Sequence, residues 1–228
     1  MAGLIDFLTS NKKYAKHIRS KAILKIVPML NPDGVCFGNY RTGLSGKDFN
    51  REYMNPDAQI FPEIHSLKKL VSEYKKKFGQ NFAMFMDFHG HSVKKNVFMY
   101  GPEYNIMDRY YYESRIFPRI LSKRTPMFRY YSCVFKIEDI KKTTARAIFL
   151  KYFNIPMCYT IEASNGSYYD TELLKDVHFN EEMWIEMGTE IGAGISEYLS
   201  IMQAAELARI NKMKMLQQRR MRSHNKSK

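Results

Sequence analysis

The sequence has few cysteines and no long hydrophobic run. Cys36, Cys133 and Cys158 are odd in number, scattered and without the paired spacing of a metal site, so they are predicted to be reduced, apolar residues in a reducing compartment. No apolar run approaches the roughly 20 residues that span a bilayer, which argues against a transmembrane segment. The start of the chain also lacks the order of a signal peptide, and these absences together favour a cytoplasmic protein.

Acidic residues are scarce as well, because 36 Lys and Arg face 23 Asp and Glu, for a net charge of +13. Residues 204–228 hold eight Lys or Arg and one acid, Glu206, so this segment carries +7 and the rest carries +6. Both portions favour acidic partners by long-range attraction. Nucleic acid, anionic membrane and acidic protein tails all qualify on charge, and a solvated basic helix is the alternative. No interleaving of basic and aromatic residues matches a nucleic-acid module, so nucleic acid is the weakest of these partners.

The length of 228 residues and the 45% apolar composition predict one globular domain, without an internal repeat. Alternating helices and apolar strands indicate an α/β layered fold. The apolar spacing predicts helices over 3–20, 62–77, 108–123, 143–153 and 179–202, and strands over 22–28, 82–88, 97–100 and 157–161.

The segment beyond Met202 keeps helical spacing at Leu207, Ile210 and Leu216, while basic residues crowd its other faces. We therefore divide the chain into a domain over residues 1–202 and a basic helical extension over residues 203–228. Disorder is expected past Arg219.

The most informative segment runs from residue 87 to residue 100 and places His89 at the end of an apolar run, where a strand would present a zinc ligand in a cleft. Upstream lie Asn-Pro-Asp-Gly at 31–34 and Asp-Phe-Asn-Arg at 48–51, and downstream lies Tyr-Thr-Ile-Glu-Ala-Ser at 159–164. In this order the motifs resemble those of the zinc carboxypeptidases, specifically their cytosolic branch, from about Gly3 to about Gly166. The resemblance implies a mixed central sheet flanked by helices, here lacking the family's first strands.

Zinc is the cofactor that the resemblance implies, held in that family by a His-x-x-Glu pair and a later histidine that corresponds to His89. The chain has one His-x-x-Glu, from His178 to Glu181, which follows Glu162 on an expected helix start and is interpreted as a coincidence. Because a catalytic zinc needs about three protein ligands, zinc is expected to be weak or absent in this chain. Without the family's first strands an apolar strand edge would be uncovered, which predicts poor solubility or self-association.

Asn50 and Arg51 match the family's binders of a terminal carboxylate, since arginine grips a carboxylate with two parallel hydrogen bonds and asparagine adds a neutral donor. A structural ion pair of Arg51 with Asp48 or Glu52 is the alternative. Arg41 corresponds to the arginine that polarises the scissile carbonyl, where its charge would stabilise the developing oxyanion. A surface arginine is the alternative for Arg41.

Glu162 ends an apolar strand, where partial burial would raise its pKa toward the range of a general base. The resemblance gives it the task of taking a proton from the metal-bound water, and a pair with a nearby lysine is the alternative. His89 would bind zinc through one ring nitrogen, while its other nitrogen or Asp87 would orient it. His91 could bind substrate or support the loop.

Arg146 lies sixteen residues before Glu162, where the family lines its side-chain pocket, so it could select glutamate; it could equally face solvent. The resemblance implies a carboxypeptidase that removes C-terminal or side-chain glutamates from acidic tails such as those of tubulin, in the cytoplasm and at the cytoskeleton or cilium. A pseudoenzyme that binds acidic tails is the alternative. A third hypothesis gives the basic extension the main role, docking on acidic polymers with steep salt dependence.

Overall fold

A mixed three-stranded sheet lies at the centre of the computed structural model, which describes the backbone of residues 1–226 and side chains through Gln218. Its strands are β1 (Met84–His91), β2 (Val97–Tyr100) and β3 (Met157–Ser164), in the order β1-β3-β2. β1 is parallel to β3, and β2 is antiparallel to it. The predicted α/β class with a mixed sheet flanked by helices is therefore confirmed.

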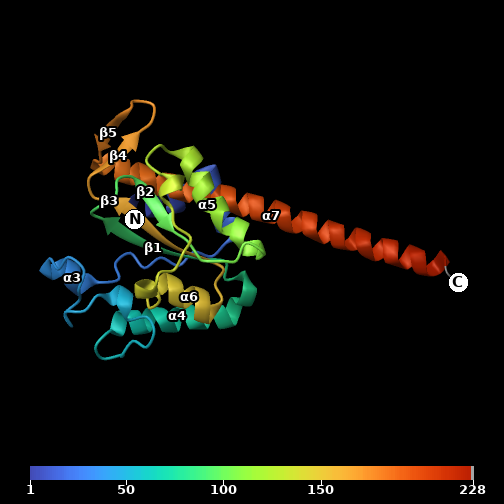
Figure 1. Ribbon diagram of the computed structural model, residues 1–228, viewed down its shortest axis with the longest axis horizontal. Helices are drawn as coiled ribbons and strands as arrows, with labels where there is room; N and C mark the ends of the chain where they lie inside the picture. The colour runs from blue at the N-terminus through green and yellow to red at the C-terminus, as the bar shows by residue number, and fades with distance from the viewer. Residues whose placement is uncertain (227–228) are drawn as a thin grey trace.

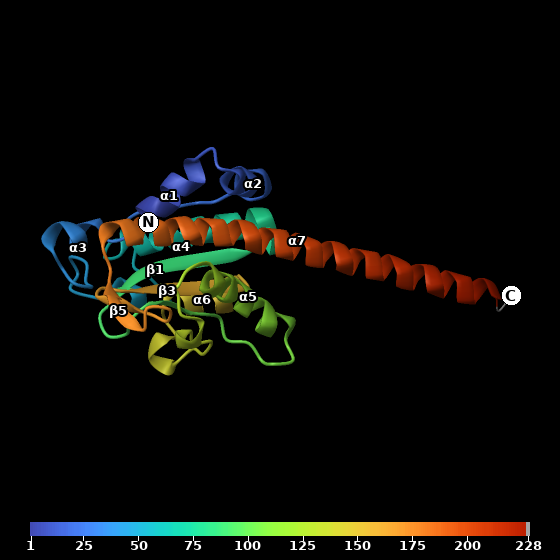
Figure 2. The ribbon, with the colours of Figure 1, turned by 90° about the horizontal axis from the view of Figure 1, so that it is seen from above.

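Helices cover both faces of this sheet. The α-helices of the described residues are α1 (Ala2–Thr9), α2 (Lys13–Lys21), α3 (Pro32–Phe37) at the periphery, α4 (Pro62–Phe78), α5 (Arg109–Arg124), α6 (Ala145–Phe153) and α7 (Glu181–Lys226). Figure 1 shows α4 and α6 on one side of the sheet and α5 and α7 on the other, with the end of α7 projecting far from the domain. Figure 2 shows α1 and α2 on the outer side of α7.

The side chains of β3 divide the hydrophobic core in two, because neighbours on a strand point to opposite faces. Tyr159 and Ile161 belong to the cluster under α1, α2, α5 and α7, whereas Cys158 belongs to the cluster under α4 and α6. The buried hydroxyl of Tyr159 donates a 2.8 Å hydrogen bond to the carbonyl of Ser114, which ties the central strand to α5. β3 is thus held on both faces, which agrees with its nearly continuous run of apolar residues.

The predicted helix over residues 3–20 is two helices in the structure. The backbone of Ser10 is extended, and its hydroxyl donates to the carbonyl of Phe7 at 2.7 Å, which ends α1. The Arg19 side chain donates to the carbonyls of Leu8 and Ser10, so it satisfies groups that the end of α1 leaves free. The break lets both short helices pack along α7.

Glycine allows the close approach of α1 and α7. A Cβ on Gly3 would lie 2.0 Å from the carbonyl oxygen of Ile185, and one on Gly188 would lie 2.6 Å from the backbone nitrogen of Leu4. Any larger residue at either position would force the two helices apart.

The hairpin of β4 (Ser167–Asp170) and β5 (Lys175–His178) was not predicted. β5 is largely exposed and its sequence, Lys-Asp-Val-His, shows no apolar alternation, so the sequence carries no strand signal there.

α7 begins at Glu181, near the predicted start, and continues past Met202 to Lys226, so the helical spacing predicted beyond Met202 belongs to the same helix. The backbone past Arg219, where disorder was expected, is helical as far as Lys226, and residues 227–228 lie outside the described part of the chain. Alanine, leucine, methionine, lysine and arginine dominate this stretch, and all have high helix propensity. Within residues 1–226 no helix has the length and apolar character required to cross a membrane.

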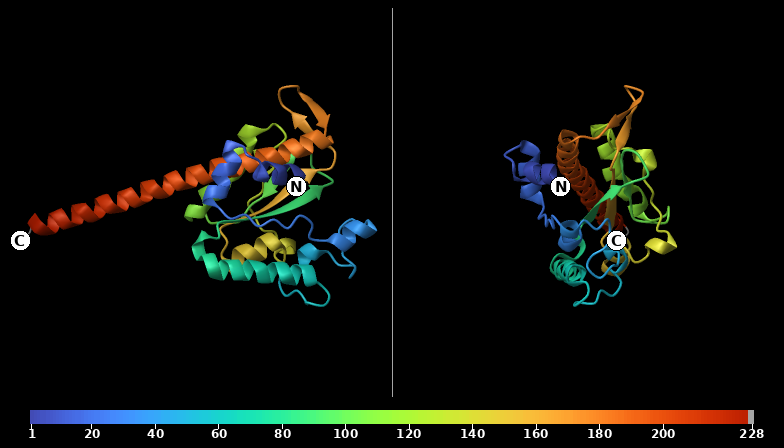
Figure 3. Two further views of the ribbon diagram at one scale, coloured as in Figure 1. Left: turned by 180° about the vertical axis from the view of Figure 1, so that it is seen from behind. Right: turned by 90° about the vertical axis from the view of Figure 1, so that its left-hand side faces the viewer.

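The predicted strand over residues 22–28 is wrong, because the segment is extended but pairs with no strand among the described residues. Figure 3 shows it as a trace that runs from α2 to α3. β1 is an edge of the sheet, and the side chains of Ile23 and Val27 are 69% and 43% exposed. An open edge beside exposed apolar side chains is a template for pairing with another chain.

We therefore expect the protein to self-associate with rising concentration. Ile23→Lys should shift the equilibrium toward monomer, because a charge beside an open strand edge opposes pairing. Sedimentation velocity over a concentration series measures the effect, and Leu173→Lys, at an exposed position in the β4–β5 turn, is the matched control. A wild-type monomer that stays monodisperse at high concentration would contradict this expectation.

Candidate active site

His89 and Glu162 lie side by side on neighbouring strands. They are Cα partners in the parallel pairing of β1 with β3, near the carboxyl ends of both strands. Adjacent strands are about 4.8 Å apart, so the two side chains project next to each other from the same face of the sheet. The carboxyl ends of parallel strands are where open α/β sheets place their binding sites.

Asp87 and Asn50 hold the imidazole of His89. The Nε2 atom of His89 lies 2.8 Å from Oδ2 of Asp87 and 3.3 Å from Nδ2 of Asn50. The Nδ2 atom of Asn50 is also 3.4 Å from the Asp87 carboxylate. Among the described residues, Nδ1 of His89 has no hydrogen-bond partner, so that nitrogen is left to meet a ligand.

Burial lowers the pKa of His89, but the hydrogen bond and charge of Asp87, together with the charges of Glu162 and Asp48, outweigh it, so the pKa is raised. The imidazole thus lies among three carboxylates, which favour its protonated form.

Asn50 connects the site to helix α6. Its Oδ1 atom accepts a 2.9 Å hydrogen bond from the backbone nitrogen of Ala145, at the start of α6. Asp48 fixes the local backbone, because its carboxylate accepts from the backbone nitrogen of Asn50 at 2.8 Å and caps the short 3-10 helix Phe49–Arg51. The Asp-Phe-Asn-Arg motif therefore folds into a turn that aims Asn50 at His89.

Arg41 and Arg51 converge on the carboxylate of Asp48, at 3.6 Å and 3.8 Å. A structural ion pair of Arg51 with Asp48 was the alternative to carboxylate binding that the sequence predicted, and this contact is present. Arg51 also donates to the carbonyl of Asn50 at 2.9 Å. Both guanidinium groups are partly exposed, at 55% for Arg41 and 36% for Arg51, so an incoming carboxylate has access to them.

Glu162 is partly buried and faces His91, whose Nδ1 atom lies 3.6 Å from Oε2 of the carboxylate. Burial raises the pKa of Glu162, and the charges of His89 and His91 oppose that rise. The ring of His91 packs edge-on against Phe98 at 5.2 Å between centroids, which positions the imidazole beside the carboxylate. The sequence left the role of His91 open, and its place beside Glu162 could not be read from the spacing along the chain.

Arg146 is 1% exposed, so the alternative that it faces solvent is wrong. Its Nη1 atom donates to the carbonyl of Gly101, and the guanidinium lies 5.7 Å from the ring centroid of Tyr100. Burial lowers the pKa of Arg146, and its Nε atom has no partner among the described residues. A buried guanidinium with a free donor is suited to meet a carboxylate.

The residues of this site do not complete a metal centre by themselves. Within residues 1–226 no group of three His, Cys, Asp or Glu is arranged to hold a metal ion. His89 offers one ligand, whereas a catalytic zinc site takes about three from the protein. His178 and Glu181 are both exposed. His178 ends β5 and Glu181 begins α7, so of this pair only Glu181 is part of the predicted helix.

Comparison with solved structures defines the class of the fold. A metallo-carboxypeptidase from Burkholderia cenocepacia superposes with a TM-score of 0.72 at 24% identity, over 88% of this chain and 52% of that one. A metallo-carboxypeptidase from Pseudomonas aeruginosa, in complex with (2-guanidinoethylmercapto)succinic acid, gives a TM-score of 0.72 at 23% identity, over 87% of this chain and 52% of that one. The chain has the metallo-carboxypeptidase fold.

Comparison with characterised sequences narrows the class to a family. Cytosolic carboxypeptidase 1 of Danio rerio is 39% identical over 178 residues, which are 72% of this chain and 15% of that protein. Cytosolic carboxypeptidase 6 of Homo sapiens is 32% identical over 205 residues, 90% of this chain and 41% of that protein. The chain belongs to the cytosolic carboxypeptidase family, and it spans less than half the length of these relatives. No family model matches it.

Proposed function

We propose that this chain provides the carboxylate-binding and base-bearing part of a zinc-dependent carboxypeptidase site. The observation that supports it best is the meeting of Asn50, Asp87 and His89 with Glu162 and His91 at one end of the sheet. Glu162 would serve as the general base, and Arg41 would stabilise the oxyanion. Zinc, when bound, supplies an activated water, and His89 would contribute one of its ligands.

The substrates we propose are acidic protein tails such as those of tubulin, shortened by removal of C-terminal or side-chain glutamates. Arg51 and Asn50 would bind the terminal carboxylate, and Arg146 would meet the glutamate side chain. The Pseudomonas metallo-carboxypeptidase is in complex with a substituted succinic acid, which agrees with a carboxylate-binding site. We propose a cytoplasmic address, with the cytoskeleton or cilium as places of action, and the basic extension would add attraction to acidic polymers.

The second candidate function is a non-catalytic module that binds acidic C-terminal tails. The shortage of metal ligands within residues 1–226 favours it. Zinc content separates the two: one bound zinc per chain together with peptide hydrolysis supports the enzyme, whereas peptide binding without zinc supports the module.

Both candidates require that Arg51 grip a free carboxylate. A glutamate-rich peptide with a free C-terminus should bind more tightly than its C-terminal amide by about tenfold or more, since hydrogen bonds between charged groups contribute roughly 1.5–3 kcal/mol. Arg51→Ala should remove most of that difference, and Arg51→Lys should restore part of it, because lysine keeps the charge but not the fork.

Fluorescence anisotropy with labelled peptides measures this difference. Lys12→Ala, at an exposed lysine near the start of the chain, is the control and should leave the preference for the free acid unchanged. Equal affinity of the wild-type protein for acid and amide would contradict both candidate functions.

A further inference from the structure

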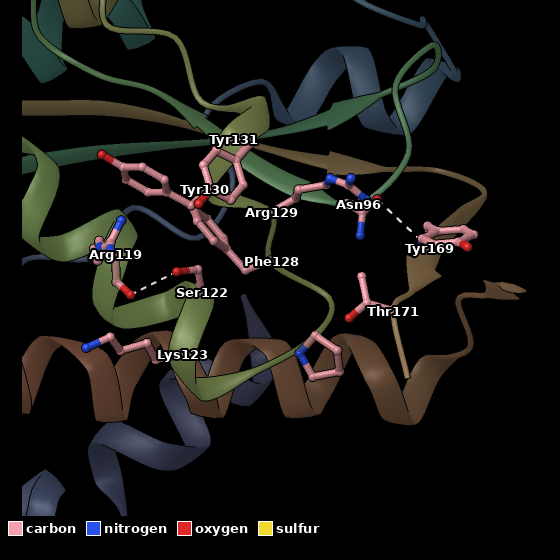
Figure 4. Close-up of a pocket in the computed structure, with 11 residues that line it drawn as sticks. Asn96, Arg119, Ser122, Lys123, Phe128, Arg129, Tyr130, Tyr131, Tyr169 and Thr171 are labelled. Atoms are coloured by element: carbon pink, nitrogen blue, oxygen red, sulfur yellow. Dashed lines mark hydrogen bonds between the residues drawn. The ribbon is translucent and has the colours of Figure 1, made fainter. Parts of the chain in front are cut away.

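A hollow of about 400 Å³ lies apart from the residues of the candidate active site. It is formed by Asn96 just before β2, by α5, by the segment that follows α5 and by the end of β4 with the turn after it, and Figure 4 shows its side chains. Its lining includes Arg119, Lys123, Arg129, Tyr130 and Asn96, and it contains no acidic residue.

Three cations surround this hollow without a counter-charge. In the described part of the chain, neither Arg119, Lys123 nor Arg129 has a carboxylate within 4.0 Å. The neighbouring Arg124 behaves differently, because it faces α7 and pairs with Glu190 at 2.8 Å. Like charges gathered at one concave surface repel one another and attract an anion.

Asn96 adds a buried donor to these charges. Its side chain is held in place, because Oδ1 accepts from the backbone nitrogen of Tyr169 at 3.3 Å, and the residue is only 3% exposed. Its Nδ2 atom has no hydrogen-bond partner within the described residues. Figure 4 shows the amide directed into the hollow. A buried donor without an acceptor costs free energy, which an anionic oxygen in the hollow would recover.

The backbone of Asn96 is fixed in a way that maintains this arrangement. Its φ of 68° is in the left-handed region, which asparagine tolerates better than most residues. Its nitrogen donates to the carbonyl of Ser167 at 2.9 Å, and its carbonyl accepts from the nitrogen of Ser164 at 3.1 Å. Asn96 is therefore held by both β3 and β4.

We propose that this hollow binds side-chain carboxylates of an acidic polypeptide segment. Arginine forks match carboxylates with two parallel hydrogen bonds, and the ring of Tyr130 offers apolar surface to the methylene groups of glutamate. Only the choice of a polypeptide as ligand rests on the proposed function.

The hollow is joined to the end of the strand that carries Glu162. The carbonyl of Asn96 bonds to Ser164, which is two residues beyond Glu162 on β3, or roughly 7 Å along the strand. Asn96 is therefore near the end of β3 that carries Glu162. The hollow itself is lined by α5, on the side of the sheet opposite α6, whereas Glu162 faces the α6 side, so the hollow is a binding surface separate from the site.

The test uses a labelled glutamate-rich peptide that carries a C-terminal amide, so that binding of a terminal carboxylate plays no part. Arg119→Gln/Arg129→Gln should weaken binding by about tenfold or more, the effect of losing charge-assisted hydrogen bonds. Lys76→Gln/Lys77→Gln, at the exposed end of α4, removes the same charge elsewhere and should change affinity by less than about twofold.

Asn96→Asp is a second variant, and it should also weaken binding. Aspartate keeps the oxygen that accepts from Tyr169 and tolerates the same backbone, but it replaces the free donor with a negative charge. Unchanged thermal melting of each variant shows that the fold is intact.

Equal losses in the hollow and control variants would overturn the proposal, since they would reflect net charge alone. If the protein bound inorganic phosphate at the hollow but did not bind the peptide, the proposal would be overturned in favour of a free-anion site. If the hollow variants lost binding to RNA but not to the peptide, it would be overturned in favour of nucleic acid. The two proposals fail in different measurements. If only the hollow proposal is wrong, the wild-type protein still prefers the free-acid peptide through Arg51. If only the proposed function is wrong, the wild-type protein still binds the amide peptide through the hollow.

Discussion

Replacement of Glu162 by glutamine lowers kcat for peptide hydrolysis by about 10³-fold under the proposed function, because loss of a general base typically costs 10²–10⁴-fold. Glutamine has the shape of glutamate but cannot take a proton. The side chain sits beside His91 and His89 at the end of β3, where burial has raised its pKa. The measurement is kcat from steady-state hydrolysis of an acidic peptide by a zinc-loaded preparation of the protein that hydrolyses this peptide.

Binding separates loss of the base from loss of the fold. The Kd of the Glu162→Gln variant for the same peptide should change by less than about threefold, since the base acts on the transition state and not on the ground state. His91→Ala is the neighbouring control and should reduce kcat much less. Retention of wild-type kcat in Glu162→Gln would end the assignment of Glu162 as the base.

The helices and the central strand of the fold were predictable because their residues carry strong periodic signals. The apolar spacing of α4 and α5 and the continuous apolar run of β3 gave the right element at nearly the right bounds. Segment 22–28 carries an equally clear strand signal, yet it is unpaired within the described residues, because pairing depends on a neighbouring strand that local sequence does not reveal.

The site was predictable in its chemistry but not in its contacts. The resemblance to a family, together with residue type, identified His89, Glu162 and Arg51 as candidates. The hydrogen bond from Ala145 to Asn50 joins residues 95 positions apart, and the contact of His91 with Glu162 depends on strand register. Such geometry follows from tertiary packing and has no signal in a single sequence.

The hollow at Asn96 could not be predicted from the sequence for the same reason. Arg119, Lys123 and Arg129 read as ordinary surface charges on and after a helix. Only the fold shows that they share one concave surface, and only hydrogen bonding among the described residues shows that Asn96 has a free donor there.

Phe149→Ala is expected to destabilise the protein by about 3–5 kcal/mol, the usual effect of truncating a buried phenylalanine. Phe149 is fully buried and packs edge-to-face on Phe85 at 4.7 Å, Tyr53 at 5.6 Å and Phe153 at 5.5 Å between centroids. In a protein of this size a change of 1 kcal/mol moves Tm by about 2–4 °C, so Tm should fall by roughly 10 °C.

The effect should reach the site through α6. This helix carries both Phe149 and Ala145, and the nitrogen of Ala145 positions Asn50 beside His89. Even below its Tm, the variant should therefore bind the free-acid peptide less well. Tyr152→Ala on the same helix is the control, since its side chain is 53% exposed and its loss should shift Tm by only a degree or two. If Phe149→Ala and Tyr152→Ala had the same Tm, the packing of α6 on the sheet would contribute little stability and would not be what holds Asn50 in place.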